Sequence, residues 1–195
     1  MTTNGGITMA AYQFTARIEH TEKTIESLYK AQYHAYEKPK MLLWLAVGFA
    51  MIFVAAFSAL PTWAKALLLL IGGWVVVSID FPGQVRADRA LEERKADLPK
   101  MEYEFHKDQM KISGEGSMSI PYKKIVRLTE DKYYFYIIFS KDSICMIDKS
   151  TVRPKSEKEL KEFLAEKTNL YWQNEKSFLT MNLADVMLII NNRKK

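Results

Sequence analysis

Two long apolar runs dominate the pattern of hydrophobic and polar positions along the chain. The first, from Met41 to Leu60, contains twenty residues without a charge or a proline. At 1.5 Å per residue, a helix of this length spans about 30 Å, which is the thickness of the hydrocarbon core of a bilayer. The pattern therefore predicts a membrane-spanning helix over residues 41–60.

The second run is shorter, and its flanks decide how it is interpreted. Ala66 to Ile79 is uncharged over fourteen residues, a length typical of a buried core helix or an interfacial segment. A helix from about Trp63 to Phe81 has nineteen residues. Lys65 can be part of it, because its long side chain near the helix end extends the ammonium group to the headgroups. We therefore expect a transmembrane hairpin over residues 41–81, with spans at 41–60 and about 63–81. Two central helices of a globular α domain are the alternative.

Basic residues flank the hairpin unevenly, which predicts its orientation. The connection contains only Lys65, whereas the two outer flanks contain Lys23, Lys30, Lys38, Lys40, Arg86, Arg89, Arg94, Lys95 and Lys100. Because cytoplasmic flanks retain lysine and arginine, both termini are expected in the cytoplasm and the turn at Pro61 outside. Asp80 lies at the inner end of the second span. We favour an interfacial acid that reaches water over a functional intramembrane carboxylate.

The segments around the hairpin predict short soluble elements. Residues 1–10 lack periodicity and are expected to be disordered. Residues 11–38 contain an alternating strand pattern from Tyr12 to Ile18 and a helix that Thr21 caps. Residues 82–99 are rich in charges of both signs and predict a helical stalk, which Pro82-Gly83 separates from the apolar helix.

From residue 101 to residue 172 the pattern changes to period two. Short alternating runs separated by turn residues predict an antiparallel sheet, in which residues 144–147 form the last strand. Ser156 and Glu159 form a capping box before a closing helix. A lone strand cannot satisfy its backbone, so the strand from Tyr12 to Ile18 should join this sheet. The hairpin would then be an insertion within one folded unit.

Residues 173–195 form a tail with an apolar face and a basic end. Packing on the sheet domain and an amphipathic helix that binds a partner or the inner leaflet are both compatible with this pattern. The fold class predicted from the whole chain is an α+β membrane protein, with a two-helix hairpin and a cytoplasmic sheet domain.

Composition changes this picture little. The chain is 48% hydrophobic and has a net charge of +5, with positive and negative residues interspersed. This distribution favours a solvated surface over a nucleic-acid groove. Cys145 is the only cysteine, which excludes an intramolecular disulfide and fits a reducing compartment. Its place in an apolar strand favours a small buried hydrophobe over a reactive thiol.

The order of these elements resembles the YcxB-like membrane proteins of bacteria. The resemblance covers residues 12–172 and is carried by YEFHKDQMKIS and SIPYKKIVRLTEDKYYFYIIF, most specifically by Ile120-Pro121-Tyr122 with Ile125 and by Tyr134-Phe135-Tyr136. It implies a sheet domain similar to the pleckstrin-homology (PH) fold and a location in the bacterial cell membrane, and it carries no established reaction. Ile147-Asp148-Lys149 departs from the family pattern of an apolar residue, proline and lysine, which affects only a local turn.

The residues predict no catalytic or metal site. His20, His34 and His106 are scattered, and Gly114-Glu115-Gly116 is typical of a hairpin turn rather than a phosphate loop. We therefore expect neither an enzyme nor a cofactor. An enzyme with its site at the membrane face is the least favoured hypothesis.

Two other functional hypotheses remain. The preferred one is an interaction module in which the sheet domain binds a protein or an anionic lipid headgroup through Lys123, Lys124 and Arg127. The alternative is a protective factor, such as bacteriocin immunity, that acts through the hairpin. Tyr33, Tyr36, Trp44 and Trp63 are expected to anchor the chain at the bilayer interfaces. The sequence leaves the oligomeric state open.

Overall fold

The computed structural model of the chain describes residues 13–94, 98–114 and 116–174, and these form two compact units. The sheet unit comprises residues 13–18 and 102–174, and the helical unit comprises residues 19–101. The helical unit is thus an insertion within the sequence of the sheet unit. The predicted disorder of residues 1–10 and nearly all of the predicted tail lie outside the described residues.

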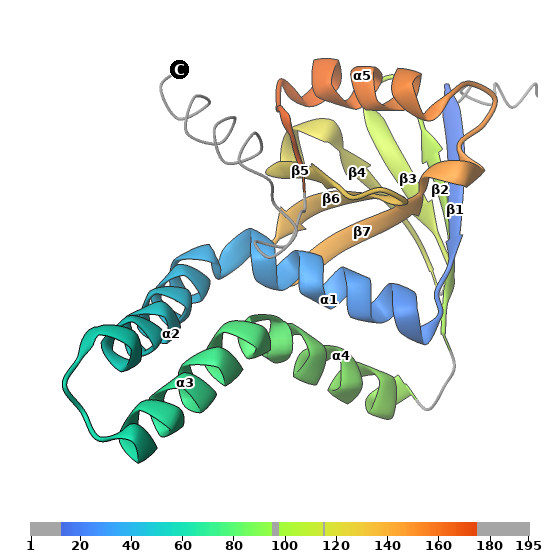
Figure 1. Ribbon diagram of the computed structural model, residues 1–195. Helices are drawn as coiled ribbons and strands as arrows, with labels where there is room; N and C mark the ends of the chain where they lie inside the picture. Colours follow the sequence, from blue (N-terminus) through green and yellow to red (C-terminus); the bar gives the residue numbers. More distant parts are fainter. Residues whose placement is uncertain (1–12, 95–97, 115, 175–195) are drawn as a thin grey trace, which may run out of the picture. The chain divides into compact units, whose positions relative to one another are not determined.

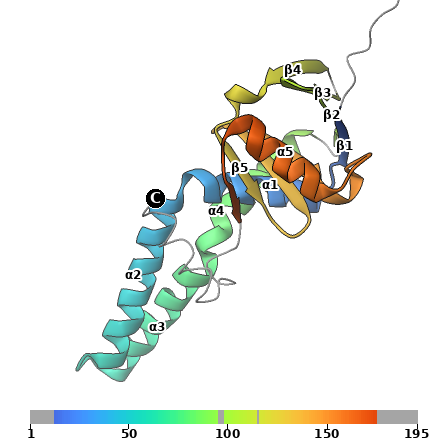
Figure 2. The ribbon, with the colours of Figure 1, turned by 90° about the horizontal axis from the view of Figure 1, so that it is seen from above.

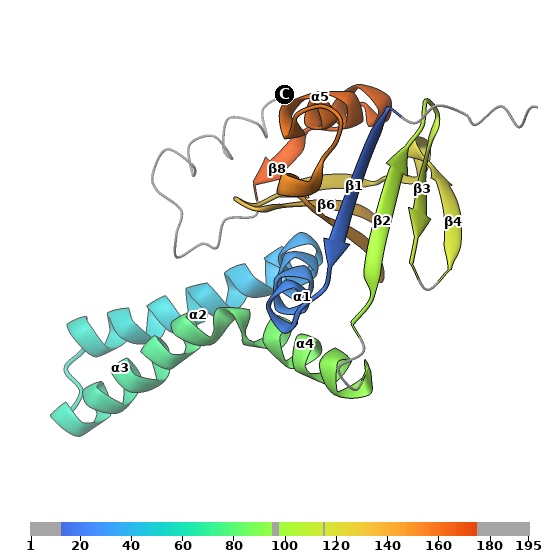
Figure 3. The same ribbon diagram turned by 90° about the vertical axis from the view of Figure 1, so that its right-hand side faces the viewer.

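The first sheet contains strands from both sides of the insertion. Its strands are β1 (Phe14–Glu19), β2 (Lys100–Phe105), β3 (Gln109–Ser113) and β4 (Ser117–Pro121), in the order β1-β2-β3-β4 (Figure 3). Hydrogen bonds from Gln13 N to Phe105 O and from His20 N to Pro99 O lie at opposite ends of the first pair, so β1 and β2 are antiparallel. The prediction that the amino-terminal strand joins the later sheet is confirmed.

A second sheet corrects the prediction of a single one. Strands β5 (Arg127–Glu130), β6 (Tyr134–Ser140) and β7 (Ser143–Asp148) form a meander, and β8 (Trp172–Asn174) adds to β5 in parallel, giving the order β7-β6-β5-β8. The predicted last strand is therefore followed by another. A parallel partner 44 residues along the chain leaves no local turn signal, so the sequence pattern did not indicate β8.

One helix and two 3-10 turns complete the sheet unit. The turns are η2 (Tyr122–Lys124) and η3 (Lys149–Thr151), and α5 (Glu157–Thr168) begins at the predicted capping box of Ser156 and Glu159. Leu160 and Leu164 of α5 are fully buried. The ring of Phe163 lies between Phe14 of β1 and Tyr122 of η2, at centroid distances of 5.3 and 5.6 Å. These contacts close the core over the first sheet.

The helical unit contains four helices and a 3-10 turn. They are α1 (Glu22–Tyr36), α2 (Lys38–Phe57), α3 (Thr62–Val77), η1 (Ser78–Asp80) and α4 (Phe81–Arg94). Thr21 caps α1 as predicted. The spans differ from the prediction: α2 begins at Lys38, since Pro39 fits the first turn of a helix, and α3 gives way to η1 after Val77.

Helices α2 and α3 lie side by side and contact each other through two glycines (Figure 2). A Cβ built on Gly72 would lie 2.9 Å from the carbonyl oxygen of Gly48, and one on Gly48 would lie 2.7 Å from Val76 Cγ2. The other faces are exposed, including Leu43, Phe57 and Leu70. Helix α2 and the segment from Thr62 to Glu93 are long and apolar enough to cross a membrane, and only 17% of each apolar window is buried.

Helix α4 is not the predicted stalk, because it packs along α1 (Figure 1). A Cβ on Gly83 would lie 3.4 Å from Lys30 Cα and 3.5 Å from Tyr33 Cβ. Ala87, one turn further, is fully buried. Gly83 and Ala87, at positions i and i+4, form this packing face. Because such small residues give no hydrophobic periodicity, the sequence pattern of α4 was dominated by its charged residues.

Candidate functional site

The predicted basic residues lie at the start of the second sheet. Lys123 and Lys124 are both exposed on η2, and Val126, which follows after the buried Ile125, is 55% exposed. Arg127 is half-buried in β5, opposite Ile138 of β6. The structure therefore brings two of the three cations together on a solvent-facing turn, next to an exposed apolar side chain, whereas Arg127 belongs to the strand.

The four predicted interface anchors lie in different environments. Trp44 of α2 is 55% exposed and Trp63 of α3 is 72% exposed, so both side chains can contact the solvent or lipid around the helices. Tyr36 is half-buried. Tyr33 is only 3% exposed and packs toward α4 with Arg86 over its ring. The prediction for Tyr33 is corrected, because an interface anchor must expose its ring to the lipid.

Asp80 forms a charged cluster at the break between α3 and α4. Its two carboxylate oxygens accept hydrogen bonds from His34 Nε2 at 2.7 Å and from Lys30 Nζ at 2.6 Å, and both donors lie on α1. The side chains of His34 and Asp80 are 6% and 13% exposed. We expected Asp80 to reach water, but in the structure α1 encloses it. Residues 30 and 34 are one turn apart on α1, which is the spacing that aims both side chains at one carboxylate.

Glu37 forms a matching cluster at the break between α1 and α2. Its carboxylate accepts hydrogen bonds from Arg86 of α4 and, at 3.2 Å, from Lys40 of α2. The hydrogen bond from Arg86 lowers the pKa of Glu37 and outweighs the burial that raises it. Burial and the negative charge of Glu37 raise the pKa of Tyr33. Asp80, at the break between α3 and α4, is thus paired with α1, and Glu37, at the break between α1 and α2, is paired with α4.

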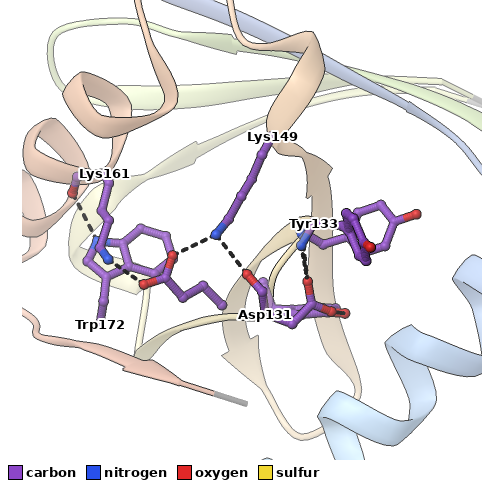
Figure 4. Close-up of polar contacts among 8 residues, drawn as sticks. Asp131, Tyr133, Lys149, Lys161 and Trp172 are labelled. Carbon is purple, nitrogen blue, oxygen red and sulfur yellow. Dashed lines mark hydrogen bonds and ion pairs between the residues drawn. The ribbon is translucent and has the colours of Figure 1, made fainter. Parts of the chain in front are cut away.

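A third carboxylate, Glu130, connects the parts of the sheet unit. Lys149 Nζ donates to Glu130 Oε2 and to the carbonyl oxygen of Asp131, both at 2.7 Å, and Lys161 of α5 donates to the second oxygen of Glu130. Trp172 of β8 donates to the carbonyl oxygen of Lys161 at 2.9 Å (Figure 4). The cluster therefore joins β5, η3, α5 and β8, which indicates a structural role.

Replacing Glu130 with glutamine is expected to destabilise the protein by about 2 kcal/mol, because Lys149 would then be a largely buried cation without a counter-ion. Burial by itself raises the pKa of Glu130, but the hydrogen bonds from Lys149 and Lys161 outweigh this effect and bring the pKa below 4.5. Its stabilising effect is therefore complete above pH 4.5 and declines as the pH falls through the lowered folded-state pKa. Thermal unfolding of the purified chain at pH 7 and pH 4 measures both effects. Exposed Glu162→Gln is the control, and equal stability of the two variants would contradict this role.

A cavity of about 600 Å³ lies along the outer face of β1 and β2. Arg17, Glu102, Glu104 and Arg153 line it with charges of both signs. Arg153 also exchanges backbone hydrogen bonds with Thr15, which covers the outer edge of β1. Ala16 and Tyr103 also line the cavity, and its edge strand β1 is already paired.

Cys145 and the possible metal-binding side chains are the remaining candidate groups. Burial raises the pKa of Cys145 to about 12, so its thiol is a poor nucleophile at neutral pH. Among residues 13–94, 98–114 and 116–174, no group of three or more histidine, cysteine, aspartate or glutamate side chains could hold a metal ion. In the helical unit, the Asp80 and Glu37 clusters each place a largely buried carboxylate beside two basic side chains. Asp80 was a candidate from its place at the inner end of the second span, whereas the signal for Glu37 is its place between two helical patterns.

Comparison with known proteins supports the assignment of the sheet unit. Residues 105–164 match the family model described as YcxB-like protein. Neither the curated proteins nor the solved structures gave a significant match. The matched segment begins in β2 and ends in α5, and it includes Lys123, Lys124 and Glu130. The resemblance seen in the sequence is therefore confirmed over residues 105–164, which are similar to the YcxB-like family.

Proposed function

We propose that this protein is a membrane-anchored, non-enzymatic interaction module of a bacterial cell. The hairpin α2–α3 crosses the membrane with its Pro61 turn outside, and the sheet unit binds an acidic ligand in the cytoplasm. The observation that carries the proposal is the pair of apolar helices with exposed outer faces. Burying such faces in hydrocarbon stabilises them, whereas water around them is costly.

The topology supports a PH-like architecture for the cytoplasmic part. Apart from the inserted helical unit, strands β1–β4 of the first sheet, the meander β5–β7 and helix α5 follow one another in the chain. Leu160 and Leu164 of α5 lie in the core. The helical unit is inserted between β1 and β2, so two neighbouring strands lead to it. Two covalent connections would hold the domain at the bilayer more firmly than a single flexible linker.

The exposed turn η2 supports the assignment of a binding surface. Lys123 and Lys124 are adjacent exposed cations, and the exposed Val126 lies two residues after Lys124. A basic turn with an apolar neighbour suits an acidic protein segment or an anionic lipid headgroup, because both present negative charge beside apolar groups. We assign Arg127 an accessory role, since its side chain is half-buried in β5.

The test uses the full chain in nanodiscs of zwitterionic lipid, because a fragment beginning at residue 101 would lack β1. Immobilised nanodiscs are offered vesicles containing phosphatidylglycerol, or a glutamate-rich peptide. Replacing Lys123 and Lys124 together with glutamine is expected to reduce capture of one probe by about tenfold or more, since each lysine contributes about 1 kcal/mol near an anionic surface. Lys132→Gln combined with Lys158→Gln is the control with the same charge change.

The two probes distinguish the ligand classes. Capture of vesicles supports a lipid headgroup, and capture of the peptide supports an acidic protein. Equal capture by wild type and the Lys123/Lys124 variant, or capture of neither probe, would contradict a binding role for η2. Protection of cells against a pore-forming peptide that survives this substitution would favour the alternative, a protective role of the hairpin.

A further inference from the structure

The Glu37 cluster brings two cations to one carboxylate. Arg86 contacts one oxygen of the Glu37 carboxylate, and Lys40 contacts the other. The carboxylate is 9% exposed, whereas the side chains of Lys40 and Arg86 are 71% and 40% exposed. The buried acid thus contacts two cations whose side chains are partly exposed. Each cation contacts a different oxygen of one carboxylate, and two oxygens of a phosphate could be contacted in the same way.

The charge of this cluster is not balanced. One carboxylate faces two cations, and Lys38 adds a third exposed cation in the same turn of α2, where no acid is present. The other acid of the junction, Asp80, already has its own partners in Lys30 and His34. The Glu37 cluster therefore keeps a positive surplus that an anion would neutralise.

Arg86 is held ready for a ligand by two contacts. Its guanidinium group lies 5.8 Å from the centre of the Tyr33 ring and hydrogen-bonds to Glu37. A cation that is fixed by an aromatic face and a carboxylate loses less side-chain entropy when it binds an anion. Guanidinium and ammonium groups together suit phosphate oxygens, the first by its planar donors and the second as a point charge.

The position of the cluster indicates which anion it meets. Leu42, Leu43 and Trp44 follow Lys40 on α2 after the buried Met41, and they are 46%, 63% and 55% exposed. Hydrocarbon that covers these residues begins within about one helical turn of Lys40, because the rise is about 1.5 Å per residue. A lipid whose acyl chains cover Leu43 and Trp44 has its headgroup at the height of Lys40.

We propose that Lys40 and Arg86 bind the phosphate of an anionic phospholipid headgroup, and that Glu37 and Tyr33 are positioning residues for these two cations. The proposal rests on the membrane insertion proposed above and is independent of ligand binding at η2. The site is chemically distinct from the Asp80 cluster, in which the carboxylate is the central group and two donors of α1 enclose it.

The experiment measures lipid retention by the full chain. The protein is purified in a neutral detergent, phosphatidylglycerol or phosphatidylcholine is added, and native mass spectrometry counts the lipids that remain bound. Wild type is expected to retain phosphatidylglycerol in preference to phosphatidylcholine. Replacing Lys40 and Arg86 together with glutamine is expected to reduce this preference by about tenfold or more, since each cation near an anionic surface contributes about 1 kcal/mol. Lys158→Gln with Arg89→Gln, both at exposed positions, is the matched control and should retain the preference.

Glu37→Gln tests the positioning role. It keeps the volume of the side chain but releases Lys40 and Arg86, so the preference for phosphatidylglycerol is expected to fall, by less than in the variant that loses the two cations themselves. The unfolding midpoint, measured beside lipid retention, separates this effect from a loss of folding, and an unchanged preference in Glu37→Gln would contradict the positioning role. Unchanged preference in the Lys40/Arg86 variant would overturn the proposal.

Two further outcomes are informative. Displacement of the lipid by an equal concentration of inorganic phosphate would overturn the lipid assignment and leave a general phosphate site. Failure of the protein to co-float with bilayers would instead contradict the membrane insertion on which the proposal rests.

Discussion

Replacing Gly72 with leucine is expected to separate α2 from α3 and to lower the thermal midpoint of the purified protein by at least about 5 °C. A Cβ at this position would lie 2.9 Å from the carbonyl oxygen of Gly48 and 3.1 Å from Met51 Cβ. Backbone and Cβ atoms cannot move aside as the end of a flexible side chain can, so the helices must shift. Overpacking of this kind costs about 1 to 3 kcal/mol or more, and each kcal/mol corresponds to about 2 to 4 °C in a chain of this size.

The adjacent glycine provides the matched control. A Cβ on Gly73 meets no atom within 4 Å. Gly73→Leu therefore adds the same side chain to the same helix without disturbing the contact with α2, and a midpoint within about 2 °C of wild type is expected. Equal losses in the two variants would mean that the close approach at Gly72 does not hold the hairpin together.

Replacing Asp80 with asparagine is the second substitution with a large expected effect. It keeps the shape of the side chain but removes the charge that faces Lys30 and the buried His34. Truncating a buried ion pair costs about 3 to 5 kcal/mol, and the 42% exposure of Lys30 reduces this to about 2 kcal/mol here. The measurement is the unfolding midpoint in detergent, with exposed Asp88→Asn of α4 as the control.

A double-mutant cycle identifies the partner of Asp80 that contributes most. Combining Asp80→Asn with His34→Gln is expected to give a coupling energy larger than combining it with Lys30→Gln, because His34 is buried and Lys30 is partly solvated. Contacting residues typically couple by about 0.5 to 3 kcal/mol. A coupling near zero for His34 would contradict the proposed junction.

The sequence indicated those parts of the fold that have a local signal. Thr21 and Ser156 cap helices where the capping pattern placed them, and the aromatic run beginning at Tyr134 forms a buried strand. The strand beginning at Phe14 was paired correctly with the later sheet, since an isolated strand leaves its backbone unsatisfied.

The missed features depend on contacts that no local pattern records. The face of α4 is made by Gly83 and Ala87, which are too small to give an apolar stripe. Strand β8 pairs with β5, 44 residues earlier in the chain. The Glu37 cluster needs three helices to meet, so the sequence showed only an acid between two helical patterns. Tyr33 resembled an interface anchor because its neighbours were aromatic, whereas burial against α4 is a tertiary effect.

Cysteine accessibility tests the central claim, that the hairpin crosses a membrane and the sheet unit lies in the cytoplasm. Cys145 is the only cysteine, so Cys145→Ser gives a background without thiols. Thr62→Cys marks the hairpin turn and Lys158→Cys marks the exposed face of α5. With a membrane-impermeant maleimide, the thiol at residue 62 should react in intact cells and the thiol at residue 158 only after permeabilisation. Labelling of both positions in intact cells, or of neither until the cells are opened, would contradict the claim.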